Sequence, residues 1–483
     1  MKEPSVNDRA VGTLKKTTDN GQGLIDNDTI AAIATPPGQA GIGIIRISGP
    51  LSIEIAEKTF RPKNPIQGLD SHHLYLGSFL DPSSGDMVDE VLLSFMKAPH
   101  SYTREDIVEI NSHSGHLLLS RVLQIILDQG ARLARPGEFT LRAFLNGRID
   151  LTQAEAVIDL INAKSDRGLH LASRQIKGTF RNEIEGLRQK AIDCLAHAEV
   201  AIDFPDEERE IISRKTTSKR IAKELVKPIE DLIKTQATKR LWVDGINTVI
   251  VGRVNAGKSS LLNRLLNEQR AIVTAIPGTT RDIVESTITI EGLPLRLMDT
   301  AGLRHGKNEA ERIGIHFTEQ KMAVADFLIV VIDQSRPLNP DDHRIIAQSR
   351  GKNVLIVINK IDLPSKLSKE AEQCAFSGFP IARISALTGQ GLDQLRKRIS
   401  GCLLKGDIDV TASDSAPNMR HRQALMDAAT FFKSAAQNAK IDAPMEIVAF
   451  ELKSGLDALG KIIGKTPTED VLDSIFSQFC LGK

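Results

Sequence analysis

Cysteine is scarce in this sequence, and long apolar runs are missing from it. The cysteines lie far apart and include no Cys-x-x-Cys pair, which argues against a disulfide framework and against a zinc knuckle. No apolar stretch approaches the ~20 residues of a membrane-spanning helix. We therefore expect a cytoplasmic protein without a membrane partner. The four cysteines are Cys194, Cys374, Cys402 and Cys480.

An excess of charge of one sign is also absent, because 62 Lys and Arg residues face 61 Asp and Glu residues. A protein built as a polycation for nucleic acid would be far more basic, so any contact with RNA must be local or supplied by a partner. Hydrophobic residues make up 41% of the chain, which lets each domain bury a core. The length of 483 residues corresponds to about three domains at roughly 150 residues each.

The first part of the chain changes character near residue 26. Residues 1–25 are polar, include acidic residues and lack an apolar segment, so we expect a disordered extension that is neither a signal peptide nor a transit peptide. Residues 26–146 have the mixed pattern of an α+β domain. Its expected strands are at 43–47, 88–95 and 107–110, and its expected helices are near 51–59 and 116–128.

The remaining chain alternates between helical and α/β character. Residues 147–243 are helical in pattern, and Thr152 and Glu155 are predicted to form a capping box. Residues 244–405 alternate between β-rich and helical segments, which predicts a doubly wound parallel sheet, and helical periodicity returns over 406–483. We expect a discontinuous all-α domain with the α/β domain inserted into it. The expected strands of the inserted domain are 248–251, 295–298, 327–332, 354–358 and 381–384.

A phosphate-binding loop is predicted at residues 252–259, which read Gly-Arg-Val-Asn-Ala-Gly-Lys-Ser between a strand and a helix. Its backbone N–H groups would cradle phosphates. Lys258 would reach the β- and γ-phosphates, and Ser259 would bind Mg²⁺. The pattern also fits a glycine-rich turn, so further elements are needed to assign a nucleotide site.

Four further elements follow in the order of a guanine-nucleotide site. Asp299 ends a predicted strand, where an acid can hold Mg²⁺ through water, and Thr280 is a second candidate for Mg²⁺. Asp362 can accept the paired N–H groups of guanine, which adenine does not offer. Together the elements resemble the small GTPase superfamily and predict a Ras-like P-loop GTPase domain. The predicted GTP-binding residues are Asn255, Ala256, Gly257, Lys258, Ser259, Ser260, Thr274, Ala275, Ile276, Pro277, Gly278, Thr279, Thr280, Asp299, Thr300, Ala301, Gly302, Asn359, Lys360, Asp362, Ser385, Ala386 and Leu387.

One position departs from the Ras-like pattern. Leu303 follows Gly302, where Ras-like proteins have a glutamine that orients the attacking water. Charge in the transition state must therefore be stabilised in another way. The amide oxygen of Asn255 can help to coordinate a monovalent cation beside the phosphates, and the alternative is that Asn255 only braces the loop.

Strings along nearly the whole chain from residue 28 resemble one family. They are Ala-Thr-Pro-Pro-Gly at 34–38, Arg-Pro-Gly-Glu-Phe-Thr at 135–140, Ala-Ile-Asp-Phe-Pro at 201–205, the GTPase elements, and Phe-Cys-Leu-Gly-Lys at 479–483. The resemblance is to the tRNA uridine-5-carboxymethylaminomethyl modification GTPases, the MnmE or TrmE family. The terminal Cys-x-Gly-Lys is the most discriminating string, because other GTPases lack it.

The resemblance implies a multidomain α+β and α/β protein with an N-terminal folate-binding domain, through which the chain forms a homodimer. With an FAD-dependent partner, MnmG (GidA), in a hetero-oligomer, such proteins add aminomethyl-type groups to C5 of the wobble uridine, position 34, of certain tRNAs. A tetrahydrofolate derivative, 5-formyl- or 5,10-methylene-tetrahydrofolate, would supply the one-carbon unit. Hydrolysis of GTP with Mg²⁺ would be activated when two G domains dimerise around K⁺.

The resemblance also implies roles for single residues. Folate contacts fall on Arg46, Glu109, Arg148 and Lys483. Without the resemblance, the first three of these would be interpreted as surface charges of an α+β domain. Arg148 departs from the family pattern, which has lysine, and this changes the donor geometry. The K⁺ ligands would be Asn255, Thr274, Ile276 and Thr279, and the Mg²⁺ ligands Ser259 and Thr280. The implied catalytic residues are Glu311, Lys258, Thr280, Asn255 and Cys480, of which Cys480 is either a nucleophile or an exposed thiol.

Two weaker features and one rival function complete the predictions. His113-Ser114-Gly115-His116 is interpreted as a turn and helix cap rather than a metal site, and Arg420-His421-Arg422 as a solvated helix start rather than an RNA contact. The rival function is an Era-like ribosome-associated GTPase switch. It would need a basic RNA-binding domain after the G domain, but residues 407–483 carry eight Lys and Arg against eleven Asp and Glu. A folate enzyme with a degenerate nucleotide domain is disfavoured by the intact GTPase elements.

Overall fold

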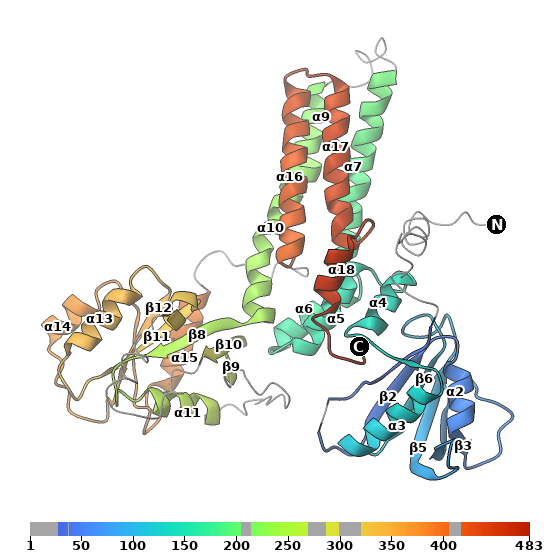
Figure 1. Cartoon of the computed structure of the whole chain (residues 1–483). Helices are drawn as coiled ribbons and strands as arrows, with labels where there is room; N and C mark the ends of the chain where they lie inside the picture. Colours follow the sequence, from blue (N-terminus) through green and yellow to red (C-terminus); the bar gives the residue numbers. More distant parts are fainter. Residues whose placement is uncertain (1–27, 37, 204–213, 269–285, 299–319, 405–416) are drawn as a thin grey trace. The chain divides into compact units, whose positions relative to one another are not determined.

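The structure is a computed structural model that describes residues 28–36, 38–203, 214–268, 286–298, 320–404 and 417–483 (Figure 1). The chain divides into two compact units. The first unit comprises Met1–Ile158, Gln175–Glu230 and Arg420–Lys483, and the second comprises Asp159–Arg174 and Asp231–Met419. The extension predicted at residues 1–25 lies outside the described residues. Within the described residues, no helix combines the length and the apolar character that a bilayer span requires.

A seven-stranded sheet forms the N-terminal part of the first unit, in the order β3-β4-β5-β6-β2-β1-β7. Neighbouring strands are antiparallel except for β1 and β7, which are parallel. The predicted strands and helices of this region are confirmed. Buried and partly buried positions alternate along most of β2 and along the second half of β5, with the period of two that a strand has. The elements are β1 (Ile30–Ile33), β2 (Gly43–Ser48), α2 (Ser52–Thr59), β3 (Phe60–Pro62), β4 (Leu74–Leu80), β5 (Met87–Met96), β6 (Ile107–Ser112), α3 (His116–Asp128), β7 (Arg132–Leu133) and α4 (Glu138–Leu145).

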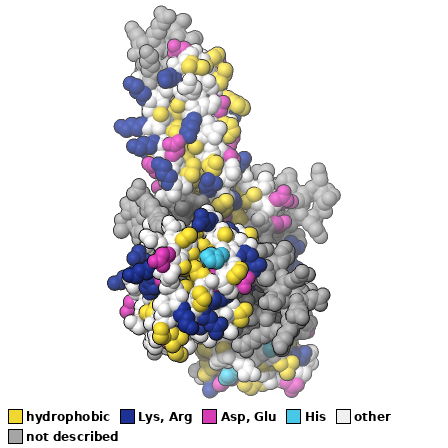
Figure 2. Space-filling model, turned by 90° about the vertical axis from the view of Figure 1, so that its left-hand side faces the viewer, with side chains coloured by type: hydrophobic (Ala, Val, Ile, Leu, Met, Phe, Trp, Pro, Cys, Tyr) yellow, Lys and Arg dark blue, Asp and Glu magenta, His cyan; other side chains and the backbone are white. Residues whose placement is uncertain are grey.

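Long alanine-rich helices form the rest of the first unit and lie side by side (Figure 1). Small residues let them approach closely. A Cβ added at Gly455 would lie 2.5 Å from the ring of Phe432. Lys and Arg side chains are visible along the helices in Figure 2. Among the helical residues, Lys219, Lys223 and Lys227 are exposed. The helices are α5 (Leu151–Asn162), α6 (Asp166–Ile176), α7 (Thr179–Asp203), α9 (Arg214–Ile221), η1 (Ala222–Val226), α10 (Lys227–Lys239), α16 (Met419–Lys440), α17 (Met445–Ile463) and α18 (Glu469–Phe476), of which α5, α6, α10 and α16 continue into the second unit.

The start of α5 differs from the prediction. Oδ1 of Asp150 accepts hydrogen bonds from Thr152 N at 2.7 Å and from Thr152 Oγ1 at 2.6 Å, so Asp150 is the capping side chain. The carboxylate of Glu155 instead accepts hydrogen bonds from Arg420 Nε and Nη2, each at 2.9 Å. The predicted capping box is therefore wrong, because Thr152 already lies inside the helix.

The predicted solvated start of α16 is also wrong. His421 is fully buried, its Nε2 lies 2.6 Å from Glu155 Oε2, and its ring lies 4.9 Å from that of Phe180. Burial raises the pKa of Glu155, but the charges of His421 and Arg420 outweigh this effect and hold that pKa well below its usual range. The basic cluster is thus an internal contact between α5 and α16.

The second unit contains a six-stranded sheet in the order β13-β12-β11-β8-β10-β9. Its neighbouring strands are parallel except for β9, which runs antiparallel to β10 and is an edge strand outside the prediction. The other predicted strands are confirmed. The elements are η2 (Arg240–Asp244), β8 (Ile246–Val251), α11 (Lys258–Glu268), β9 (Ser286–Ile290), β10 (Leu293–Met298), β11 (Phe327–Asp333), α13 (Pro340–Ser349), β12 (Val354–Asn359), α14 (Lys369–Ala375), β13 (Ile381–Arg383) and α15 (Leu392–Leu403).

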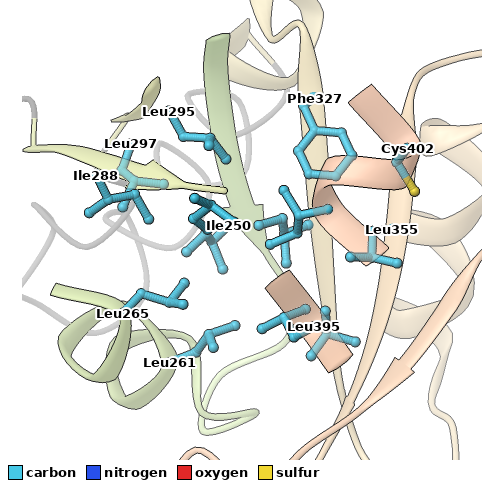
Figure 3. Close-up of a cluster of buried hydrophobic side chains, with 14 of the residues drawn as sticks. Ile250, Leu261, Leu265, Ile288, Leu295, Leu297, Phe327, Leu355, Leu395 and Cys402 are labelled. Atoms are coloured by element: carbon cyan, nitrogen blue, oxygen red, sulfur yellow. The ribbon is translucent and has the colours of Figure 1, made fainter. Parts of the chain in front are cut away.

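Each face of this sheet carries its own core. On one face, Ile250 of β8 packs with Leu261 of α11 and Leu395 of α15 (Figure 3). On the other face, Val249 and Val251 of the same strand belong to a cluster that includes residues of α13 and α14. Burial on both faces explains why these strands read as continuous apolar runs in the sequence.

Candidate functional site

The phosphate-loop segment connects the end of β8 to the start of α11, which is the predicted strand–loop–helix context. Two of its glycines have backbone conformations that side chains rarely adopt, with φ of +151° at Gly252 and +99° at Gly257. A Cβ at Gly252 would lie 2.3 Å from Val331 O, and one at Gly257 would lie 2.1 Å from Asn359 Nδ2. Glycine is therefore required at both positions to bring the loop against β11 and β12.

Lys258 begins α11 and turns its ammonium group back over the loop. Its Nζ donates to Gly252 O at 2.8 Å and to Arg253 O at 2.9 Å, and burial lowers the pKa of Lys258. Asn255 is exposed with φ of +63°, and Ser259 is exposed in the first turn of the helix. One cationic nitrogen, a helix N-terminus and two polar side chains thus lie together, which is the arrangement that binds phosphate groups.

Asn359, the last residue of β12, joins three loops. Its Nδ2 donates to Ala256 O at 2.9 Å, and its Oδ1 accepts from Ala386 N at 3.0 Å. Arg264 of α11 also donates to Ala386 O, at 3.3 Å, and to Leu387 O, at 2.5 Å. The structure therefore places the phosphate loop beside the predicted guanine-binding segments, as the sequence motifs require.

The segment after β12 that is predicted to bind guanine presents an exposed acid. Asp362 is exposed, whereas Lys360 has φ of +67° and its Nζ lies 2.7 Å from Asp333 Oδ2. Ser385 is buried, and its Oγ accepts from Thr388 N at 3.1 Å, which shapes the third loop. An exposed carboxylate at the carboxyl edge of a parallel sheet is placed to accept hydrogen bonds from a base.

Several predicted site residues lie outside the described residues, and their roles stay predictions. They are Thr274, Ala275, Ile276, Pro277, Gly278, Thr279, Thr280, Asp299, Thr300, Ala301, Gly302, Leu303 and Glu311.

A charged cluster beside the phosphate loop was missed by the sequence motifs. Nη1 of Arg253 lies 3.3 Å from Asp342 Oδ2, and its Nη2 lies 3.9 Å from Asp333 Oδ2. Asp333 ends β11 directly opposite Asn359, the last residue of β12. One signal in the sequence could have revealed this cluster. Asp333 is an acid at the end of a buried apolar strand, and that strand lies next to the one that ends in the Asn-Lys-x-Asp segment.

A second group of predicted residues meets on the sheet of the first unit. Arg46 of β2 and Glu109 of β6 are cross-strand neighbours, with Arg46 Nε 2.7 Å from Glu109 Oε1. The guanidinium of Arg46 lies 5.6 Å from the ring of Tyr102. Arg148 lies 4.6 Å from the same ring and donates to Tyr102 O at 3.0 Å. Two of the predicted residues, Arg46 and Arg148, thus lie beside one aromatic ring, and Glu109 is paired with Arg46. Tyr102 is the member of this group that sequence reasoning missed.

The C-terminal segment reaches this group from the far end of the chain. Gly482 O accepts a hydrogen bond from Arg46 Nη1 at 3.3 Å. Gly482 has φ of +87°, and a Cβ there would lie 2.4 Å from Ile33 O, so only glycine fits against β1. Phe479 is buried against α4 and α5, whereas Cys480 is exposed and Lys483 is partly exposed.

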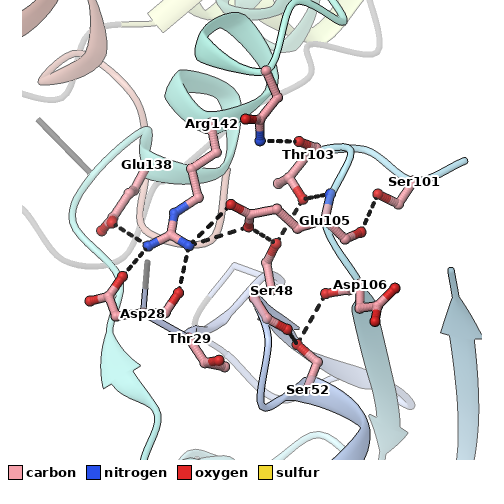
Figure 4. A network of polar contacts seen from close by, with 12 residues as sticks. Asp28, Thr29, Ser48, Ser52, Ser101, Thr103, Glu105, Asp106, Glu138 and Arg142 are labelled. Atoms are coloured by element: carbon pink, nitrogen blue, oxygen red, sulfur yellow. Dashed lines mark hydrogen bonds and ion pairs between the residues drawn. The ribbon is translucent and has the colours of Figure 1, made fainter. Parts of the chain in front are cut away.

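A network of ion pairs and hydrogen bonds around Arg142 includes residues of the loop that carries Tyr102, among them Thr103 and Glu105 (Figure 4). Arg142 of α4 is 1% exposed, and its guanidinium lies 2.6 Å from Asp28, 3.1 Å from Glu138 and 3.2 Å from Glu105. Ser48 Oγ donates to Glu105 at 2.7 Å. Burial raises the pKa of Asp28 and of Glu138, but the arginines outweigh it, so both pKa values lie below the ordinary range. The network fixes α4, β2 and the loop that carries Tyr102.

Two family models match this chain. A family model described as the MnmE helical domain matches residues 151–480, and one described as the GTP-binding protein TrmE N-terminus matches residues 29–148.

Three relatives, each named tRNA modification GTPase MnmE, match almost the whole chain. The relative from Thermoanaerobacter pseudethanolicus is 44% identical, covering 94% of this chain and 99% of the relative. The relative from Geobacillus kaustophilus is 44% identical and that from Moorella thermoacetica 46%, each covering 95% of this chain and 100% of the relative. The chain therefore belongs to the MnmE family of tRNA modification GTPases.

Proposed function

We propose that this protein is the GTP-hydrolysing subunit of a cytoplasmic tRNA-modifying complex. The complex adds a (carboxymethyl)aminomethyl group to C5 of the wobble uridine, position 34, of certain tRNAs, using a one-carbon unit from a tetrahydrofolate. The observation that carries the proposal is the presence of two separate sites in a chain of this family. One is the phosphate loop braced by Asn359, and the other is the Arg46–Glu109 pair beside Tyr102.

The first site suits GTP. Lys258 would exchange its two carbonyl partners for the β- and γ-phosphates. Burial disfavours the charged form of Lys258 and lowers its pKa, and the negative phosphates would stabilise that charge, which makes the exchange favourable. Asp362 would accept the N1–H and amine of guanine. We place Mg²⁺ with Ser259 and Thr280, where it would supply positive charge to the γ-phosphate.

A monovalent cation fits the same loop. The exposed Asn255, held with φ of +63°, offers an amide oxygen, and oxygen is the ligand type that K⁺ takes. We infer that Asn255, Thr274, Ile276 and Thr279 would hold K⁺, which supplies the charge that an arginine finger supplies in other GTPases. Glu311 would orient the attacking water through a second water.

The second site suits a reduced folate. Glu109 accepts from Arg46 through Oε1, which leaves Oε2 for the N–H edge of a pterin. Arg148 and Lys483 would bind the glutamate carboxylates. The ring of Tyr102, which lies 5.6 Å from Arg46 and 4.6 Å from Arg148, would add an aromatic surface beside the pterin. Cys480, exposed two residues before Gly482, stays a candidate nucleophile.

We propose a homodimer through the N-terminal domain, an FAD-dependent partner, MnmG, and tRNA as the substrate. A chain with formal charge +1 must contact tRNA locally. Lys219, Lys223 and Lys227 support such a contact, because they are exposed at four-residue spacing on α9, η1 and the first turn of α10.

The test is nucleoside mass spectrometry of tRNA from cells that lack the gene. We expect the aminomethyl-type nucleosides at position 34 to disappear and to return with the native gene. A Lys258→Ala gene should not restore them, because the variant loses its phosphate contact. Unchanged wobble uridines in the deletion strain would overturn the proposal.

A further inference from the structure

The guanidinium of Arg253, the second residue of the phosphate loop, lies between two buried carboxylates. Nη1 is 3.3 Å from Asp342 Oδ2, and Nη2 is 3.9 Å from Asp333 Oδ2. Nη1 also donates to Pro337 O at 3.2 Å. The side chain of Arg253 is 11% exposed, and the two carboxylates are 1% and 2% exposed. Charges buried to this extent need a counter-charge, which Arg253 gives to both acids.

Each carboxylate is fixed in place by groups other than Arg253. Oδ1 of Asp333 accepts from Ser335 N at 2.9 Å and from Ser335 Oγ at 2.6 Å, and its Oδ2 accepts from Lys360 Nζ at 2.7 Å. Oδ2 of Asp342 accepts from Asn339 N at 3.1 Å in the capping box of α13. The positions of the two acids are therefore set by β11 and α13.

Near its exposed centre the loop is also held by Asn359, whose Nδ2 donates to Ala256 O at 2.9 Å. Asn255 is exposed and has φ of +63°, in the left-handed region that asparagine adopts more readily than most other residues with a side chain. Arg253 lies two residues before it, and Lys258 Nζ donates to Arg253 O at 2.9 Å. The side chain and the backbone of Arg253 thus connect the start of the loop to both the carboxylates and the phosphate-binding lysine.

We propose that Arg253 is a positioning residue for the binding of nucleotide and cation at the phosphate loop. Its ion pairs with Asp333 and Asp342 hold the start of the phosphate loop against β11 and α13, and so keep Asn255 in the conformation that meets nucleotide and cation. Because Asp333 also binds Lys360 of the guanine segment, one carboxylate links the phosphate and base loops. This role rests on the proposed binding of GTP at the loop.

The experiment uses the full-length Arg253→Gln variant, which removes the charge and keeps a polar side chain. Because the change leaves two buried carboxylates with one cation, the double variant Arg253→Gln/Asp342→Asn is made as well, to remove one unpaired charge. Arg344→Gln is the matched control, since Arg344 of α13 pairs with Asp341 of the same helix but is 44% exposed. Each variant is measured for the Kd of fluorescent GDP and GTP, for kcat, for the K⁺ concentration at half-maximal rate, and for Tm.

We expect Arg253→Gln to raise the Kd of GDP and of GTP by the same factor, about tenfold, because the loop holds the phosphates of both nucleotides. At saturating GTP, kcat should fall less than threefold, and the K⁺ concentration at half-maximal rate should rise severalfold. The double variant should recover Tm but keep the weakened nucleotide and K⁺ responses. Arg344→Gln should match the native protein.

Three outcomes would overturn the role of Arg253. The first is a folded Arg253→Gln variant with the native Kd values and the native K⁺ response. The second is a double variant that recovers nucleotide affinity together with Tm. The third is an Arg344→Gln variant that loses as much nucleotide affinity as Arg253→Gln. If the native protein failed to bind GTP, the proposed function would fail instead, and the two failures are therefore distinguishable.

Discussion

Replacement of Glu155 by glutamine should destabilise the first unit strongly, because the carboxylate of Glu155 contacts both Arg420 and His421. Glu155 has a 9% exposed side chain, accepts two hydrogen bonds of 2.9 Å from Arg420, and lies 2.6 Å from the fully buried His421. Breaking a buried ion pair by removing one charge costs about 3–5 kcal/mol. Glutamine keeps one acceptor oxygen, so we expect about 3 kcal/mol, near the lower end of that range.

The assay is thermal and urea unfolding of the full-length protein, followed by far-ultraviolet circular dichroism of the helices. A loss of about 3 kcal/mol should lower the Tm of the helical transition by roughly 6 °C. The loss should also depend on pH. Since the pKa of Glu155 lies below its ordinary value of 4.5 in the folded protein, its stabilisation is present above pH 4.5 and is lost as the pH falls below it. The native protein and the variant should therefore converge in acid.

The control is Glu199→Gln, an exposed glutamate of α7. It should leave the transition unchanged, because an exposed carboxylate contributes little. The reasoning would be refuted if Glu155→Gln unfolded like this control, or if the difference from the native protein were as large at pH 3.5 as at pH 7.

Three further substitutions test the two proposed sites. Asp362→Asn should move nucleotide preference from GTP toward xanthosine triphosphate, whose 2-oxo group accepts where guanine's amine donates; full GTP preference in competition binding would contradict the assignment of the base site. Asn255→Ala should abolish the faster hydrolysis expected in K⁺ than in Na⁺ at equal ionic strength, and native turnover that ignores the cation would count against the K⁺ site. Glu109→Ala should abolish the binding of a reduced folate in isothermal titration. Its basal GTP hydrolysis should stay within a few-fold of the native rate, because the two groups of residues belong to different units. Loss of hydrolysis in this variant would disprove that the two sites are independent.

Most strands were predictable because the physical cause of their pattern is local. Phe327–Ile332 sends alternate side chains into cores on both faces of its sheet, so every position is apolar and the run stands out. The edge strand β9 was missed because its polar positions face away from the core and it is only five residues long. The capping box at Thr152 failed for a different reason. Asp150 and Thr152 both fit the local pattern, and the partner that engages Glu155 lies 265 residues away.

The features of the candidate sites also divide into those that follow from local sequence and those that depend on tertiary contacts. The phosphate loop is continuous in sequence, and its spacing predicts its structure. The position of Asn359 beside Ala256 follows from the order of the sheet, and this could be inferred from the motif. The ion pairs of Arg253 could not be inferred, because they depend on how the end of β11 and the first turn of α13 meet the loop.

The hydrogen bond between Arg46 and Gly482 has a consequence for synthesis. The two residues are 436 positions apart, so a ribosome that has already made the complete N-terminal sheet must still make the helical and α/β segments that follow it before Gly482 O emerges. The sheet can fold on the nascent chain, but Arg46 Nη1 lacks this acceptor until Gly482 has been made. The group of residues around Tyr102 is therefore completed late, and a prematurely terminated chain would carry a folded N-terminal domain without this contact.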